Sequence, residues 1–300
     1  MRYGMNHYWI PGIATLALMF TLAACDTTTV EPELSEEEAE AVAGVMADAL
    51  SDRSDGMMAG LHDLTASVSR DGLSYSSSAA KNGGRDWRGA HRSFSAEYDS
   101  TTGEHVIQYR REVDRPNVYK KVGVNLTYVF EDVDGNVLAF PRRAYDDIAT
   151  IIFDGRRAGE TNITRPRGSR ASTLDRDAQW VLSGLEDGTP TMSLNGTQTH
   201  VGTQRVDRGG SVATREYSMR LNVVDVTIRK PTEDDEPLEE RISGTLEYQA
   251  TVKRTIDGEE RENTYRGTVE LDGAGAARLR LMGFRHPFFI NLANGDVDDA

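Results

Sequence analysis

The chain has 300 residues and a large excess of acidic side chains, with a formal net charge of −14 at pH 7. Nucleic-acid binding depends on lysine and arginine side chains that neutralise phosphates, so this balance argues against nucleic acid as a partner. A single cysteine excludes a disulfide scaffold and a thiolate zinc site. Roughly 260 residues remain beyond the amino-terminal segment, which is enough for one large hydrophobic core or two small ones.

The amino terminus has the pattern of an export signal. Residues 1–24 contain one basic side chain, Arg2, then an apolar run over 13–22 and small residues before the cysteine. The run is too short, and is interrupted too early by proline and glycine, for a transmembrane helix. A cleaved signal with a chance cysteine remains an alternative to the interpretation that follows.

The residues that end this pattern are Leu22-Ala23-Ala24-Cys25. They resemble the lipobox of bacterial lipoprotein precursors. The resemblance implies cleavage before Cys25, a diacylglyceryl group on its thiol and a further acyl chain, such as palmitate, on the new amino terminus. Two or three acyl chains make membrane attachment durable, whereas one holds weakly. We therefore expect a signal peptide over 1–24, a lipidated Cys25 with a polar tether over 25–34, and a location in the bacterial cell envelope.

Two amphipathic helices are predicted over 35–69. Ser35 and Glu38 form the pattern of a capping box, and acidic residues crowd the first turn. In the first helix the apolar residues fall on one stripe, and they are Ala39, Val42, Met46, Ala49 and Leu50. A second stripe follows the Asp55-Gly56 break, at Met57, Leu61, Leu64 and Val68. Residues 70–90 are rich in serine, glycine and asparagine and are expected to form a loop.

The remainder, 91–297, has the pattern of antiparallel β structure. Alternating apolar and polar residues run over 118–131, 212–229 and 239–256, which is longer than the usual strand and requires coiling or bulges. Hairpins with type I′ turns are predicted at six dipeptides, Asp134-Gly135, Asp154-Gly155, Asn195-Gly196, Asp257-Gly258, Asp272-Gly273 and Asn294-Gly295. The predicted fold class is mainly β (α+β), with a large curved antiparallel meander sheet or half-open barrel and two amino-terminal helices packed on it as one globular unit. This architecture resembles lipoprotein carriers of the LolA and LolB kind, by shape alone and without a shared motif.

No catalytic, cofactor-binding or metal-binding signature is present, so no catalytic residue, metal ligand or cofactor is predicted. A hairpin at 99–103 would place His105 opposite Glu97, most simply as a surface pair. The acidic stretch 131–136 imitates the start of a calcium loop, but its glycine is one position early and the bidentate glutamate is missing, so it is interpreted as a hairpin tip. The acidic stretch 233–236 is interpreted as a solvated connection.

Arginines gather in one stretch of the acidic chain. Between residues 155 and 174 the basic side chains are Arg156, Arg157, Arg165, Arg167 and Arg170. In an exposed loop their guanidinium groups would contact phosphate, lipid headgroups or acidic glycan. Trp87, in a glycine-rich stretch, would be a stacking platform for a sugar ring. The alternatives are a loop neutralised by the surrounding acids, and a tryptophan packed against the helices.

The sequence therefore predicts a membrane-anchored cell-envelope lipoprotein that acts as a non-enzymatic binding or structural module. The expected partners are the membrane, through the lipid on Cys25, and an envelope protein, lipid or glycan. Two other functions remain open. A carrier of a lipid or other apolar ligand would need a hollow between helices and sheet. A hydrolase, the least favoured of the three, would need a pocket with several titratable groups of perturbed pKa.

Overall fold

The structure, a computed structural model, describes residues 34–67 and 91–299, except 167, 187, 209–210, 233–235 and 257–258. The predicted signal peptide, Cys25, the loop at 70–90 and Trp87 lie outside the described residues. The chain divides into two units, Met1–Pro32 and Glu33–Ala300. All the described residues belong to the second, which is called the Glu33–Ala300 unit below.

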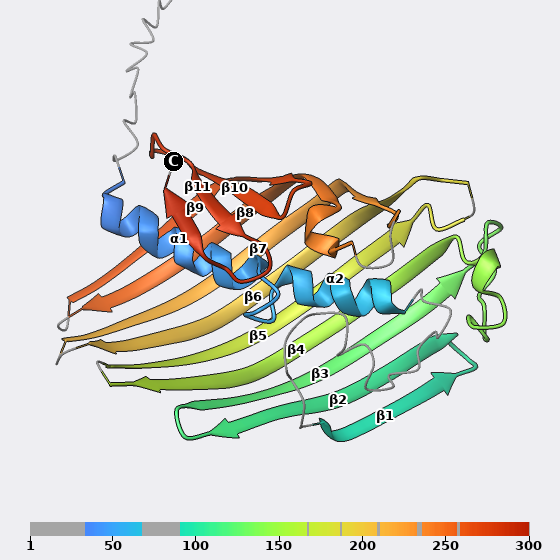
Figure 1. The fold of residues 1–300 in the computed structure, drawn as a ribbon, viewed down its shortest axis with the longest axis horizontal. Helices are drawn as coiled ribbons and strands as arrows, with labels where there is room; N and C mark the ends of the chain where they lie inside the picture. The colour runs from blue at the N-terminus through green and yellow to red at the C-terminus, as the bar shows by residue number, and fades with distance from the viewer. Residues whose placement is uncertain are drawn as a thin grey trace, which may run out of the picture. The chain divides into compact units, whose positions relative to one another are not determined.

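The Glu33–Ala300 unit is built on one sheet of twelve strands, in which each strand is hydrogen-bonded to the next one along the chain (Figure 1). All pairs are antiparallel, so the predicted meander is confirmed. The order ends at the first and last strands, and the described sheet is therefore open. The strands are β1 (His91–Asp99), β2 (Glu104–Arg115), β3 (Val118–Glu131), β4 (Thr150–Arg165), β5 (Gly168–Ser183), β6 (Thr191–Arg208), β7 (Ser211–Arg229), β8 (Ile242–Ile256), β9 (Glu259–Asp272), β10 (Ala276–Leu281), β11 (Phe288–Asn291) and β12 (Val297–Asp299).

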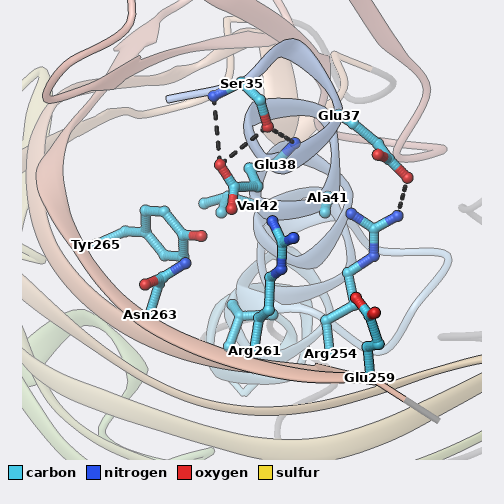
Figure 2. Close-up of a pocket in the computed structure, with 11 residues that line it drawn as sticks. Ser35, Glu37, Glu38, Ala41, Val42, Arg254, Glu259, Arg261, Asn263 and Tyr265 are labelled. Carbon is cyan, nitrogen blue, oxygen red and sulfur yellow. Dashed lines mark hydrogen bonds and ion pairs between the residues drawn. The ribbon is translucent and has the colours of Figure 1, made fainter. Parts of the chain in front are cut away.

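The long strands carry bulges, as their length predicts. The pairing of β6 with β7 shifts between Leu194 and Gly196, and that of β7 with β8 shifts between Val223 and Thr227. At this point Asp225 has a positive φ of 51°, and its backbone N–H donates to the side-chain oxygen of Asn195 at 2.8 Å. The bulges bend the strands, and the sheet curves around the helices (Figure 2).

Two of the six predicted turns are wrong. Asp154-Gly155 lies inside β4 and Asn195-Gly196 lies inside β6. Gly196 is required there because a Cβ would lie 2.0 Å from the carbonyl oxygen of Gln179 on β5. Gly196 therefore marks a close approach between strands rather than a chain reversal.

Three of the other dipeptides lie in turns, at Gly135, Gly273 and Gly295. Only the glycine of each pair has a positive φ, whereas a type I′ turn requires two such residues, so the predicted turn type is wrong at all three. Asp257-Gly258 lies outside the described residues, between β8 and β9.

Both predicted helices are present, α1 (Glu36–Leu50) and α2 (Met57–Ala66), on one face of the sheet (Figure 1). This face is called the helix side below. The capping box of Ser35 and Glu38 is confirmed in both directions. The second helix ends at Ala66, and Val68, the last apolar residue predicted for it, lies outside the described residues. Between the helices Asp55 adopts a positive φ of 57°.

The first helix is buried on more than the single predicted stripe. Ala41, Ala43, Val45 and Ala47 are buried along with the predicted positions. The reason is that α1 also contacts β11 and β12, at the end of the sheet. Backbone hydrogen bonds join the same regions, from Asp52 N to the Leu292 carbonyl at 2.9 Å and from Leu34 N to the Gly283 carbonyl at 3.3 Å.

Aromatic rings line the helix side next to α2. Trp180 on β5, Phe153 on β4 and Tyr128 on β3 are direct cross-strand neighbours. The rings of Phe153 and Trp180 stack with centroids 5.4 Å apart, and those of Tyr128 and Phe153 lie 5.3 Å apart. Gly60 of α2 lies directly over Trp180, where a Cβ would come within 2.8 Å of the indole ring. The absent side chain lets the helix approach the ring.

Candidate functional site

The arginines at 156–170 do not form the predicted exposed loop. They belong to the hairpin of β4 and β5, which closes where Arg165 pairs with Gly168. Because successive strand residues point to opposite faces, Arg156 and Arg157 are separated by the sheet. Arg156 is exposed and forms an ion pair with Asp175 at 2.9 Å. Arg157 is only 3% exposed and lies under the helices.

The remaining predicted contact residues do not gather into one anion site either. Arg170 lies on the helix side and pairs with Asp48 of α1 at 2.7 Å. Arg167 and Trp87 lie outside the described residues, as does the side chain of Arg165. The described arginines of this stretch therefore pair with acids of the same protein.

A group of charged side chains, most of them buried or half-buried, joins the helices to the sheet. It is called the helix-side ion cluster and consists of Asp48, Asp55, Asp63, Arg111, Lys120, Arg157, Arg170 and Arg176. Asp55 contacts three cations, with oxygen–nitrogen distances of 2.6 Å to Arg111, 2.5 Å to Lys120 and 3.5 Å to Arg157. Burial alone would raise the pKa of Asp55, but Lys120, Arg111 and Arg157 together hold it well below its usual value. Asp55 is therefore ionised at neutral pH.

The other two carboxylates of the cluster, Asp63 and Asp48, also accept hydrogen bonds from the sheet. Asp63 of α2 accepts hydrogen bonds from Arg157 and from the hydroxyl of Tyr109, the latter at 3.1 Å. Burial, followed by the charge of Asp63, raises the pKa of Tyr109 to about 12. Asp48 accepts from Arg170 and, at 3.2 Å, from the amide of Gln204. Each helix is thus held to the sheet by charge as well as by apolar contact.

Sequence reasoning missed this cluster, although a signal was present. Lys120 falls in the same alternating row as Val118, Val122 and Val124. Arg157 continues the inward row of Ile151 and Phe153. A charged residue at an inward position of a strand predicts a buried partner. The carboxylate partners of Lys120 and Arg157 are Asp55 and Asp63, which lie 65 to 102 residues away in the chain, so periodicity cannot identify them.

A second polar contact joins α2 to η3 (Leu238–Glu240), a short 3-10 turn before β8. His62 and Glu239 are 2.9 Å apart. Burial lowers the pKa of His62, but the hydrogen bond and charge of Glu239 outweigh it, so the pKa lies above its usual value. Asp52 is close enough to these residues to feel their charges. Burial, together with the negative charges of Asp55 and Glu239, raises the pKa of Asp52.

A pocket of about 380 Å³ opens between the start of α1 and the hairpin of β8 and β9 (Figure 2). Its helix wall carries Ser35, Glu37 and Glu38, and its sheet wall carries charged, amide and phenol groups over an apolar base. The sheet residues are Val252, Arg254, Glu259, Arg261, Asn263 and Tyr265. The volume lies at the lower end of the usual range of ligand sites. The pocket therefore offers charges of both signs beside a small apolar surface.

Arginines lie side by side in the sheet at this pocket. Arg215, Arg254 and Arg261 are direct cross-strand partners on β7, β8 and β9. Arg254 forms an ion pair with Glu37, as Figure 2 shows. Arg215 donates to Gln204 at 3.3 Å, and its pKa is lowered by burial and then by the charges of Arg254 and Arg170. Like charges in direct register are unfavourable, and the carboxylates of Glu37, Glu38 and Glu259 in the same pocket offset them.

A smaller hollow of about 250 Å³ lies beside the connection from β3 to β4. It is lined by His105 and by residues 139–143. Phe140 is 64% exposed there, with the guanidinium of Arg143 5.3 Å from its ring centroid. Burial lowers the pKa of His105.

The predicted pairing of His105 with Glu97 is wrong by one residue. The hairpin forms, but His105 pairs with Tyr98, and Glu97 pairs with Val106. The rings of Tyr98 and His105 lie 4.6 Å apart. A shift of one residue moves a side chain to the other face, so Glu97 and His105 do not form a carboxylate–imidazole pair.

The two acidic stretches are local structures. Asp132 accepts hydrogen bonds from the backbone of Asp134 at 2.9 Å and of Asn136 at 2.8 Å, which agrees with a turn after β3. Glu236 pairs with Arg229, and 233–235 lie outside the described residues. In the described part of the chain, no three His, Cys, Asp or Glu side chains lie close enough together to hold a metal ion.

None of the helices in the described ranges is both long and apolar enough to cross a membrane. Comparison of the chain with models of protein families, with curated proteins and with solved structures finds no match.

Proposed function

We propose that this chain is a lipid-anchored lipoprotein of the bacterial cell envelope, whose Glu33–Ala300 unit is a non-enzymatic binding or structural module. The observation that carries the proposal is the sequence Leu22-Ala23-Ala24-Cys25 after an apolar run. The predicted tether over 25–34 spans at most about 35 Å, which keeps the module near the lipid.

Replacement of Cys25 by serine should prevent lipid attachment. The wild-type protein should partition into detergent with the membrane fraction, and its mass should include the acyl chains. The Cys25→Ser protein should lose those acyl chains and be released from the membrane fraction. A membrane-bound serine variant, or a native protein with a bare thiol and an intact leader, would contradict the lipid anchor.

The packing between helices and sheet supports a module rather than a carrier of apolar ligands. Met46, Leu50, Leu61 and Trp180 are at most 1% exposed and fill the space that a carrier would leave for its ligand. The pocket at the start of α1 remains open, and it has polar walls. We infer that this pocket is the binding surface of the module and that it accepts a polar group from an envelope protein, lipid headgroup or glycan. Ser35, at its helix wall, is ten residues from Cys25 along the chain, a reach of about 35 Å.

A photo-reactive amino acid at position 261 tests this binding surface in intact cells. Arg261 is exposed in the pocket. A reactive group at this position should therefore form a defined adduct with the molecule that occupies the pocket. The matched control is position 224, where Val224 is 61% exposed and outside the pocket. An adduct at 261 alone is expected. Equal labelling at both positions, or none at 261, would remove the pocket from the proposal and leave the test of the lipid anchor unaffected.

A further inference from the structure

Arg176 of β5 is a buried cation without a carboxylate partner among the described residues. It is 2% exposed. One nitrogen, Nη2, donates to the backbone carbonyl of Asp48 at 3.3 Å and lies 3.4 Å from the ring of His200. The other two, Nε and Nη1, are buried and have no hydrogen-bond acceptor in the described part of the chain. Buried donors without acceptors are costly and point to a missing partner.

The neighbouring strands add positive charge and no negative charge. Arg157 of β4 lies directly opposite Arg176, and His200 of β6 lies opposite on the other side. Two arginines in direct register repel each other. Burial, followed by the charge of Arg176, lowers the pKa of His200 well below its usual value, so the imidazole is neutral. Burial also lowers the pKa of Arg176 to about 10.

Arg176 differs from the other cations of the helix-side ion cluster. Arg111, Lys120, Arg157 and Arg170 each form an ion pair with Asp48, Asp55 or Asp63. Among the described residues Arg176 forms no ion pair, and two of its three guanidinium nitrogens are buried without an acceptor.

The residues around Arg176 are buried, and this limits which group can neutralise its guanidinium charge. His200 is 2% exposed, Gln198 is 1% exposed and Tyr217 is 6% exposed. The hydroxyl of Tyr217 and the ring of His200 lie 3.3 Å apart, so both polar groups face the same interior region. A large ligand has no access to a region so enclosed, whereas a compact anion enclosed on folding would meet the two unpartnered guanidinium nitrogens of Arg176.

We propose that a small monovalent anion of about the size of chloride binds against the guanidinium of Arg176, under α1, as a structural counterion between the helices and the sheet. The site is separate from the pocket at the start of α1, and the proposal does not depend on the lipid anchor. The anion belongs to the folded state, because the unfolded chain does not hold Arg157, Arg176 and His200 together. Binding to the folded state alone stabilises it by mass action.

The test is the thermal stability of the full-length protein at constant ionic strength, with sodium gluconate replaced stepwise by sodium chloride or sodium bromide. Above the dissociation constant, the ratio of folded to unfolded protein should rise about tenfold for each tenfold increase in chloride. Bromide should act similarly. The Arg176→Gln variant should lose this dependence. The control Arg156→Gln removes the same charge from the opposite face of the same hairpin and should retain it.

A second measurement does not require a folded variant. The chlorine-35 resonance of a chloride solution should broaden when wild-type protein is added, and bromide should reverse the broadening by competition. Equal stability in gluconate and chloride, a chloride response that persists in Arg176→Gln, or broadening that bromide does not reverse would each overturn the proposal. Any of these results would indicate that water, rather than an anion, satisfies Arg176.

Discussion

Replacement of Asp55 by asparagine is expected to lower the free energy of unfolding by about 3–5 kcal/mol, because it leaves buried cations without their counter-charge. Arg111, Lys120 and Arg157 all contact this carboxylate. Asparagine has a similar shape and tolerates the positive φ of 57° at this position, so the change removes charge without adding backbone strain. Urea unfolding of wild type and variant at neutral pH measures the difference.

The loss of stability caused by Asp55→Asn should depend on pH in a defined direction. Asp55 has a lower pKa in the folded protein than in the unfolded chain. Its ionised form therefore stabilises the protein above the unfolded pKa of about 3.9, and this contribution is lost as the pH falls from there toward the folded pKa. The stability difference between wild type and Asp55→Asn should be full at neutral pH and shrink in acid. A difference that stayed constant through the acid range would contradict the ion-pair explanation.

Asp52 provides a control of opposite sign, three residues away. Burial, together with Asp55 and Glu239, raises the pKa of Asp52, so folding disfavours its charged form. At neutral pH the Asp52→Asn variant should therefore be at least as stable as wild type. Equal destabilisation by the two substitutions would show that any polar change in this turn is harmful and that the charge of Asp55 has no special role.

Replacement of Trp180 by alanine should cost about 3–5 kcal/mol, the usual range for removing a large buried aromatic side chain. Trp180 is 1% exposed and stacks on Phe153 beneath α2. The next residue, Val181, is 41% exposed on the opposite face. Val181→Ala in the same strand should change stability by no more than about 1 kcal/mol. Similar losses for both variants would contradict the assignment of faces in β5.

The same contact can be tested from the helix. Gly60→Ala gains up to about 1 kcal/mol in helix propensity, but its Cβ would come within 2.8 Å of the indole of Trp180, and overpacking costs about 1–3 kcal/mol. We expect a net loss. Gly44→Ala in α1 places its Cβ 3.9 Å from Arg215, an ordinary contact, and should be stabilising. In a Trp180→Ala background Gly60→Ala should also become stabilising, because the clash has been removed.

Several features of the fold follow directly from local patterns in the chain. The capping box at Ser35 begins α1 as predicted, and the alternating run over 118–131 coincides with β3. Capping and alternation involve residues that are close in sequence and act through backbone groups or exposure to water. They can therefore be recognised without knowing which strand or helix lies beside them.

Register between strands could not be predicted in the same way. Asn195-Gly196 has the composition of a hairpin turn, yet it lies within β6, where the carbonyl of Gln179 leaves room only for a glycine. His105 faces Tyr98 rather than Glu97, since the turn between β1 and β2 sets the register. These outcomes depend on contacts with other strands, and no pattern in the local sequence records them.

The sequence by itself determined the class of fold, the two helices and the meander, because the spacing of apolar residues decides which face of each element is buried. Only the tertiary structure decided what the arginines do. Arg156 and Arg157 are adjacent in the chain, but β4 directs one to solvent and the other to Asp55, between the helices, and Asp63 of α2. Whether a charged side chain is exposed or neutralised depends on which distant groups the fold brings within a few ångströms, and that information is present only in the folded protein.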